Sequence, residues 1–208
     1  MPELKPTIFV VDDDPSVRKS TGLMLKLVGF DVKTFVSAQD FLKANVQADL
    51  GCLILDVRMP GISGLALQEK LVSARTPLPV IFITGHGTVP MSVRAMKAGA
   101  VDFLQKPFEE QDLLDAVNRA ITQQRERKSE RDEADKLQQC LQSLTSREYE
   151  VFSLLVTGMA NKEIAYKLGT SERTVKAHRA QIMEKMNAGS LADLVRFAEK
   201  LKTRPSDD

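Results

Sequence analysis

Strand-length apolar runs alternate with helix-patterned segments over the first 124 residues, and this alternation limits the folds that the chain can adopt. The runs are rich in Val, Ile and Leu, and after each one apolar residues recur every three to four positions. Apolar strands separated by helices predict a parallel sheet covered on both faces. Right-handed crossovers then give an open, doubly wound α/β domain. The five predicted strands are residues 7–13, 30–35, 52–56, 79–84 and 101–105.

The rest of the chain has a different pattern. Residues 123–136 are almost entirely charged or polar and lack Gly and Pro, which predicts a solvated helix or a helical linker. From residue 145 onward the pattern predicts four helices, the first beginning at a capping box of Thr145 and Glu148. The sequence therefore predicts an α/β domain at residues 1–122, a helical linker at 123–143 and a small all-α helix-turn-helix domain at 144–208.

The composition narrows the class of protein. A chain of 208 residues that is 43% apolar can bury a core without help from other chains. It has no apolar run near the ~20 residues of a membrane span, and its N-terminus lacks the features of a signal peptide. We therefore expect a cytoplasmic protein with no membrane partner. The net charge is +1, but residues 162–185 carry six basic and three acidic residues, which permits nucleic-acid binding without establishing it.

Polar and charged residues stand at the carboxyl ends of four predicted strands. Asp12 and Asp13 end the first and Asp56 ends the third, whereas Thr84 ends the fourth and Lys106 follows the fifth. Ligands of open α/β sheets bind at this edge. Carboxylates that lie close together repel one another unless a cation joins them, and oxygen ligands suit Mg²⁺, with Mn²⁺ also possible. A carboxylate in such a site can hold a phosphoryl group as an acyl phosphate.

These positions belong to four motifs, VVDDDPSVR, LILDVRMPGISG, FITGHG and DFLQKPF. Together the motifs resemble the receiver domain of two-component response regulators over residues 5–124. The resemblance implies that Asp56 accepts a phosphoryl group from a sensor histidine kinase and that Thr84 and Lys106 bind this group. On this resemblance the chain is a phosphoacceptor and not an enzyme.

The same resemblance implies a metal site and a switch. The metal ligands that it implies are Asp12, Asp13, Asp56 and the backbone carbonyl of Arg58. The switch residues are Thr84 and Phe103, whose ring turns inward as Thr84 moves. The family also has a cis peptide bond at the position of Lys106–Pro107.

Residues 161–185 have the pattern of a helix-turn-helix. Ala165 is small enough for two helices to cross closely, Gly169 falls in the turn, and Val175 is apolar in the second helix. Lysine and arginine on that second helix can reach phosphates and guanine edges, and alanines permit close approach to a thymine methyl group. A plain four-helix bundle with a solvated basic face fits the same spacing.

The stretches LTSREYEVF and GMANKEIAYKLGTSERTVKAHRAQIMEKM resemble the LuxR-type output domain of FixJ/NarL-type response regulators over residues 144–202. The resemblance implies that the helix beginning near Ser171 enters the major groove of promoter DNA. His178 could contact DNA or pack beneath this helix. The predicted DNA-binding residues are Lys162, Thr174, Val175, Lys176, Ala177, Arg179 and Lys185.

The two resemblances together predict a transcription factor controlled by phosphorylation of Asp56. Phosphorylation would promote a homodimer through residues 89–99 and 101–105, which would bind promoter DNA and act with RNA polymerase. Two alternatives remain open. One is a phosphorylation-independent DNA-binding regulator that uses its receiver domain as an interaction or sensing module. The other is a phosphotransfer enzyme that works through an acyl phosphate.

Overall fold

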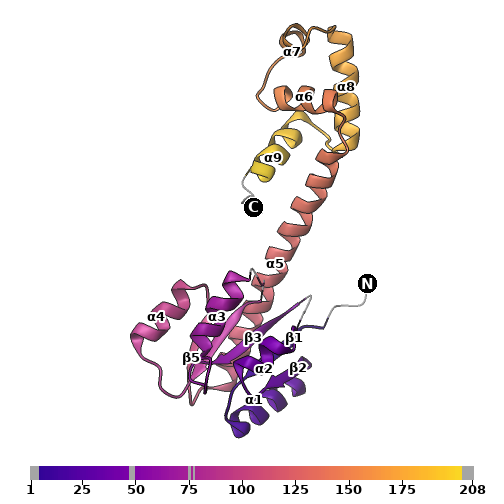
Figure 1. Cartoon of the computed structure of the whole chain (residues 1–208). Helices are drawn as coiled ribbons and strands as arrows, with labels where there is room; N and C mark the ends of the chain where they lie inside the picture. Colours follow the sequence, from indigo (N-terminus) through magenta and orange to yellow (C-terminus); the bar gives the residue numbers. More distant parts are fainter. Residues whose placement is uncertain (1–4, 47–49, 75, 77, 203–208) are drawn as a thin grey trace. The chain divides into compact units, whose positions relative to one another are not determined.

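The chain forms two compact units that meet between Arg127 and Lys128 (Figure 1). The computed structural model describes residues 5–46, 50–74, 76 and 78–202, so the outer ends of both predicted domains, at 1–4 and 203–208, lie outside it. Residues 123–142 of the predicted helical linker are helical. They belong to one helix, α5 (Glu110–Gln142), which begins in the first unit and ends in the second.

The first unit contains the five-stranded parallel sheet that the sequence predicts. The strand order is β2-β1-β3-β4-β5 and every pairing is parallel, which confirms the doubly wound α/β class. Strands β3 and β4 are buried along their whole length because helices cover both faces of the sheet. The strands are β1 (Thr7–Val11), β2 (Asp31–Phe35), β3 (Gly51–Asp56), β4 (Val80–Thr84) and β5 (Asp102–Gln105).

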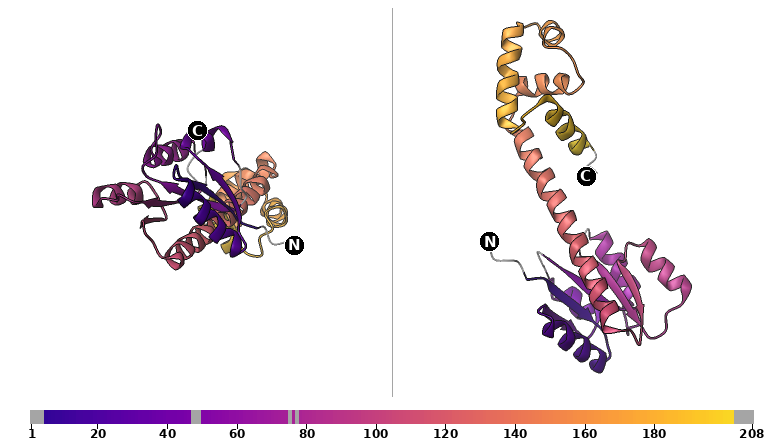
Figure 2. Two further views of the ribbon diagram at one scale, coloured as in Figure 1. Left: turned by 90° about the horizontal axis from the view of Figure 1, so that it is seen from below. Right: turned by 180° about the vertical axis from the view of Figure 1, so that it is seen from behind.

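The helices of the first unit form two layers, which the views in Figure 2 separate. One core cluster joins the sheet to α2, α3 and α4 through residues such as Phe41, Leu67 and Ala95. The other joins the opposite face to α1 and α5 through Leu25 and Val117. The remaining helices of this unit are α1 (Pro15–Leu27), α2 (Ala38–Lys43), α3 (Gly64–Ser73) and α4 (Val89–Lys97).

The second unit is helical, as the sequence predicts. Thr145 and Glu148 form the expected capping box at the start of α6, the first of the four helices that follow α5 in the described residues. The last turns of α5 belong to this unit, with Leu137 buried and Leu141 partly buried against its core. The helices are α6 (Ser146–Leu155), α7 (Asn161–Lys167), α8 (Glu172–Lys185) and α9 (Leu191–Lys202). Nowhere in the described residues is a helix both long and apolar enough to cross a membrane.

Candidate functional site

Four parallel strands bring the predicted site residues to one edge of the sheet. Asp12 follows β1, Asp56 and Thr84 are the last residues of β3 and β4, and Lys106 follows β5. Asp12, Asp56 and Thr84 are 0%, 7% and 1% exposed. The Lys106 ammonium lies between the two carboxylates, 2.7 Å from Asp12 Oδ2 and 2.9 Å from Asp56 Oδ2. Residues far apart in sequence therefore form one charged cluster.

The cluster has the ligands for a divalent cation. Carboxylate oxygens of Asp12, Asp13 and Asp56 all lie within 4.8 Å of one another. Three carboxylates facing one ammonium leave an excess of negative charge, and a hard cation with oxygen ligands such as Mg²⁺ fits this donor set. The backbone N–H of Arg58 donates to Asp56 Oδ1 at 3.0 Å, which brings the main chain of Arg58 to the site. Its carbonyl as a fourth ligand stays a prediction.

Burial and charge act together on the ionisation of the cluster. Burial raises the pKa of Asp12, although hydrogen bonds from Lys106 and from the Asp14 N–H act in the opposite direction. Burial alone would lower the pKa of Lys106, but its hydrogen bonds to Asp12 and Asp56 outweigh burial and leave that pKa above the usual value. These hydrogen bonds therefore favour the cationic form of Lys106 beside Asp56.

The predicted switch residues lie on either side of a glycine. A Cβ atom added to Gly87 would stand 2.9 Å from the Phe103 ring and 3.0 Å from Thr84 Cγ2. The Thr84 hydroxyl accepts a hydrogen bond from the His86 N–H at 3.3 Å. The half-buried Phe103 ring also packs on Phe82, with centroids 6.1 Å apart. Thr84 and Phe103 thus both border Gly87, and their coupling as a switch stays a prediction.

One residue that contributes to the site was not found from the sequence. Arg18 donates from Nη1 to the backbone carbonyl of Asp12 at 2.7 Å, so it fixes the main chain that carries two of the carboxylates. Arg18 lies on α1, and Asp14 caps the start of this helix by accepting hydrogen bonds from the N–H groups of Ser16 and Val17. The motif VVDDDPSVR contains Arg18, but only the fold shows that its side chain turns back toward Asp12.

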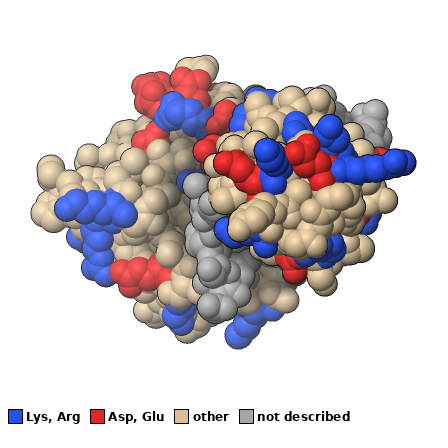
Figure 3. Space-filling model, turned by 90° about the horizontal axis from the view of Figure 1, so that it is seen from above, with Lys and Arg blue, Asp and Glu red and all other residues tan. Residues whose placement is uncertain are grey.

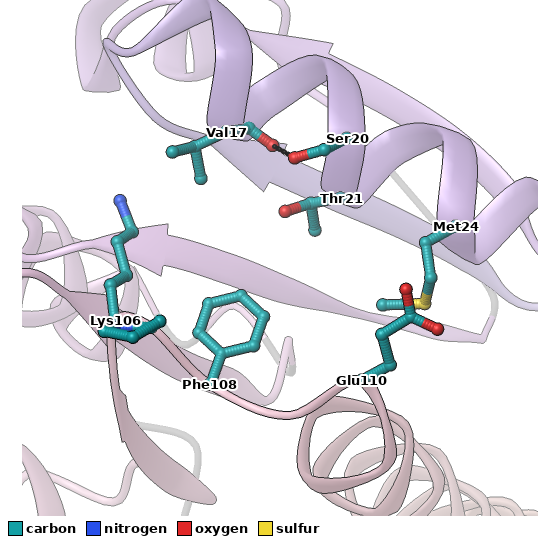
Figure 4. Close-up of a pocket in the computed structure, with 8 residues that line it drawn as sticks. Val17, Ser20, Thr21, Met24, Lys106, Phe108 and Glu110 are labelled. Atoms are coloured by element: carbon teal, nitrogen blue, oxygen red, sulfur yellow. Dashed lines mark hydrogen bonds between the residues drawn. The ribbon is translucent and has the colours of Figure 1, made fainter.

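A groove of about 520 Å³ lies beside Lys106, between α1 and the start of α5 (Figure 4). Val17, Met24 and Phe108 give it apolar walls, and Lys106 and Glu110 lie at its ends. An amphipathic helix from a partner has the apolar and charged character that would complement such a groove.

The second unit has the geometry of a helix-turn-helix. Ala165 of α7 and Val175 of α8 are both buried in its core, and Gly169 between the two helices has a φ of +61°. Such a positive φ favours glycine. The predicted DNA-binding side chains are accessible to different degrees. Lys162, Lys176 and Ala177 are exposed, and Thr174 and Arg179 are partly exposed.

Two of the predicted DNA-binding residues, Val175 and Lys185, make contacts within the second unit. Val175 has no exposed surface, so its side chain cannot contact DNA and that prediction is wrong. Lys185 forms an ion pair with Glu148 Oε2 at 2.6 Å and donates to the carbonyl of Ser143 at 3.3 Å. A DNA contact would require breaking this pair, and we leave Lys185 out of the proposed interface. His178 is partly buried, which leaves both of its predicted roles open.

The Lys185–Glu148 pair joins the beginning of α6 to the end of α8. Glu148 accepts hydrogen bonds from Lys185 and from the N–H of Thr145, and these contacts lower its pKa to about 2. Because the folded value lies below the ordinary value of 4.5, the pair stabilises the fold fully above pH 4.5. This contribution is lost as the pH falls from 4.5 toward 2.

We expect Lys185→Met to lower the melting temperature of the second unit at pH 7 and to have progressively less effect as the pH falls from 4.5 toward 2. The chain has no tryptophan, and its two tyrosines, Tyr149 and Tyr166, lie in the second unit. Tyrosine fluorescence of the full chain therefore reports the unfolding of this unit alone. A difference between wild type and variant that does not change with pH would contradict the role given to Glu148.

On the face drawn in Figure 3, charge alone does not mark out a DNA-binding surface. On this face, Lys and Arg are interspersed with Asp and Glu, and much of the surface is neither. This mixture agrees with the net charge of +1.

Comparison with protein families covers both units. Residues 8–118 match the family model described as the response regulator receiver domain, and residues 142–198 match bacterial regulatory proteins of the luxR family. Nodulation protein W of Bradyrhizobium diazoefficiens is 47% identical over 95% of this chain and 87% of its own length. Transcriptional regulatory protein FixJ of Azorhizobium caulinodans is 45% identical over 100% of this chain and 98% of its own length.

Solved structures give the same result. The response regulator StyR is 51% identical and superposes with a TM-score of 0.83 over 94% of this chain and 99% of its own. Full-length FixJ of B. japonicum is 40% identical, with a TM-score of 0.60 over 98% of this chain and 100% of its own. The similarity therefore extends over both units and their order along the chain.

Proposed function

Because the chain belongs to the response regulators that join a receiver domain to a LuxR-family DNA-binding domain, we propose that phosphorylation of Asp56 controls how it binds promoter DNA. A sensor histidine kinase and DNA are the partners that this pair of domains implies. The observation that carries the proposal is the cluster in which Lys106 bridges Asp12 and Asp56 beside the further carboxylate of Asp13.

The chemistry proposed for Asp56 is nucleophilic. A carboxylate oxygen of Asp56 attacks the phosphorus of a phosphohistidine in the kinase. A P–O bond forms as the P–N bond breaks, and the imidazole nitrogen keeps the electron pair of the broken bond. Lys106 and the Thr84 hydroxyl would bind phosphoryl oxygens. Asp12, Asp13, Asp56 and the Arg58 carbonyl would hold Mg²⁺ or Mn²⁺, which supplies positive charge against the transferred group.

The groove beside Lys106 is the proposed docking site for the kinase. Its apolar wall on α1 lies next to Lys106, which forms an ion pair with Asp56. A helix bound in the groove would therefore be close to Asp56. Val17 and Met24 supply apolar surface on that wall. Docking beside the acceptor would bring the donor phosphohistidine to Asp56 in a fixed orientation.

The proposed output is a dimer that reads two half-sites. Val89, Val93 and Met96 leave a partly apolar surface on α4, which with β5 would form the dimer face. Thr84 and Phe103 would connect this face to the phosphoryl group.

Helix α8 of each copy would enter the major groove at half-sites about 10 bp apart. Lys176 and Ala177 would contact bases, whereas Lys162, Thr174 and Arg179 would contact phosphates. The dimer would act with RNA polymerase.

The first experiment is to measure the mass of the full chain by light scattering with and without beryllofluoride and Mg²⁺. Beryllofluoride takes the place of the phosphoryl group on Asp56. We expect a monomer without it and a dimer with it, because the added group is bound by Thr84 and Lys106 next to the proposed dimer face. An unchanged mass at saturating beryllofluoride would contradict regulation through dimerisation.

A further inference from the structure

Helix α4 is attached to the receiver domain by little apolar contact. Ala95 is the one buried residue of this helix, all of which is described, and Met91 is partly buried. By contrast, the side chains of Val89, Val93 and Met96 are 76%, 45% and 46% exposed. One buried methyl group and the partly buried side chain of Met91 provide little free energy to hold a helix of nine residues in place. Polar contacts therefore add to what holds α4 in place.

A buried amide on α3 supplies such a contact. Gln68 is 2% exposed, and its Nε2 donates to the carbonyl of Ala95 at 3.2 Å and to the carbonyl of Ala98 at 3.3 Å. Ala98 is the C-cap of α4, and carbonyls at a helix C-terminus lack a partner within the helix. Within the described part of the chain, Gln68 Oε1 has no partner, so this side chain serves here as a donor. Gln68 thus caps the C-terminal end of α4 from a neighbouring helix.

The helix that carries Gln68 is itself fixed to the phosphoacceptor loop. The N–H of Gly64, the first residue of α3, donates to the carbonyl of Val57 at 3.0 Å. A Cβ added to Gly64 would lie 2.2 Å from the Asp56 carbonyl oxygen, so α3 begins in direct contact with the backbone of Asp56. Gln68 lies about one helical turn further along the same helix. Its amide therefore connects a helix anchored at Asp56 to the C-terminal end of α4.

We propose that Gln68 is a positioning residue that holds α4 in register with the phosphoacceptor loop and so sets the geometry of the dimer face. The inference rests on the proposed function, which places the dimer face on α4 and β5. Two copies associate more tightly when the contacting surfaces are already held in their bound geometry, because less conformational entropy is lost on binding. The two hydrogen bonds of Gln68 hold the C-terminal end of α4 in place, and α4 forms part of the proposed dimer face.

The test is the dimer dissociation constant of the full chain in saturating beryllofluoride and Mg²⁺, measured by analytical ultracentrifugation. Gln68→Met keeps the size of the side chain but removes both donors, and we expect the dimer to weaken about tenfold. Beryllofluoride binding by the monomer is expected to change less than about twofold. The matched control is Glu69→Gln, which breaks the ion pair with Arg94 between the same two helices. The side chains of Glu69 and Arg94 are 54% and 63% exposed, so we expect this variant to change the dimer dissociation constant less than twofold.

Amide hydrogen exchange of the monomer provides an independent measurement. Gln68→Met is expected to speed exchange at residues 95–100 and to leave the amides of β3 unchanged. If wild type forms dimers and Gln68→Met forms them equally well, or if Glu69→Gln weakens them as much, the role of Gln68 is overturned. If wild type forms no dimer, the proposed function fails, and exchange alone decides whether Gln68 positions α4. Gln68→Asn, which withdraws the amide by one methylene, replaces Gln68→Met if that variant does not fold.

Discussion

Replacing Asp56 with asparagine is expected to abolish the response of this chain to phosphoryl donors. The neutral amide is not a nucleophile, so treatment with acetyl phosphate and Mg²⁺ should leave Asp56→Asn a monomer under conditions that convert wild type to a dimer. The affinity for operator DNA should then stay at the unphosphorylated level, about 5- to 150-fold below that of the phosphorylated protein. The fold should persist, because asparagine also removes one of three carboxylates that repel one another. Light scattering and DNA-binding titrations measure the two effects.

The matched control for Asp56→Asn is Asp31→Asn. Asp31 is the exposed first residue of β2, at the opposite end of the sheet from the carboxyl ends that form the site, and its replacement removes the same charge from the same unit. It should respond to acetyl phosphate like wild type. A dimer formed by Asp56→Asn would mean that another group accepts the phosphate. Equal operator affinity with and without phosphorylation in wild type would favour the phosphorylation-independent regulator.

Gly51→Ala is expected to prevent stable folding of the first unit. Gly51 pairs with Thr7 in the register of β1 and β3, and an added Cβ would stand 1.9 Å from the Thr7 carbonyl oxygen. The obstacle is backbone and cannot rotate away. Relief would require separating two central strands and would disturb the hydrogen bond from the Gly51 N–H to Gln124. We expect a loss of more than about 4 kcal/mol, a large part of the total stability of a domain. Circular dichroism during urea unfolding measures this loss.

Gly22→Ala is the control for this glycine substitution. Gly22 lies within α1, and an added Cβ would have Thr34 Cγ2 as its nearest neighbour at 3.4 Å, an ordinary contact with a side chain. Alanine is also the better helix former by about 1 kcal/mol. The variant should therefore be as stable as wild type or slightly more so. Comparable losses in both variants would show that the close approach of Thr7 to Gly51 does not determine the outcome.

The sequence predicted the sheet and its reactive edge because both follow from local pattern and one topological rule. Apolar runs of strand length separated by amphipathic segments require parallel strands, and parallel strands place their carboxyl ends at one edge. Asp12, Asp56 and Lys106 could therefore be grouped before any contact was known, and their side chains do meet. The cis peptide bond at Lys106–Pro107, implied by the resemblance, is also confirmed.

Contacts that depend on the rotation of a helix were not predicted. Val175 was predicted to bind DNA together with its neighbours on α8, but its side chain faces the core of the second unit. Lys185 was predicted to contact DNA, and its ion pair with Glu148 was not expected because Glu148 stands on a different helix. Gln68 gave no signal, since its partners are backbone carbonyls of α4 and any residue supplies those. Each of these contacts depends on how helices pack, which residue spacing does not encode.

The ion pair of Lys185 with Glu148 also affects how strongly ionic strength controls the binding of DNA. Each phosphate neutralised by a protein cation releases condensed counterions, so the logarithm of affinity falls with the logarithm of salt concentration, with a slope of about −0.9 per contact. Lys162 and Arg179 of both copies would give a slope of about −4, and Lys185 of both copies would steepen it to about −5. Because Lys185 is neutralised within its own domain, the complex with promoter DNA should withstand a rise in cellular salt better than a count of basic residues suggests.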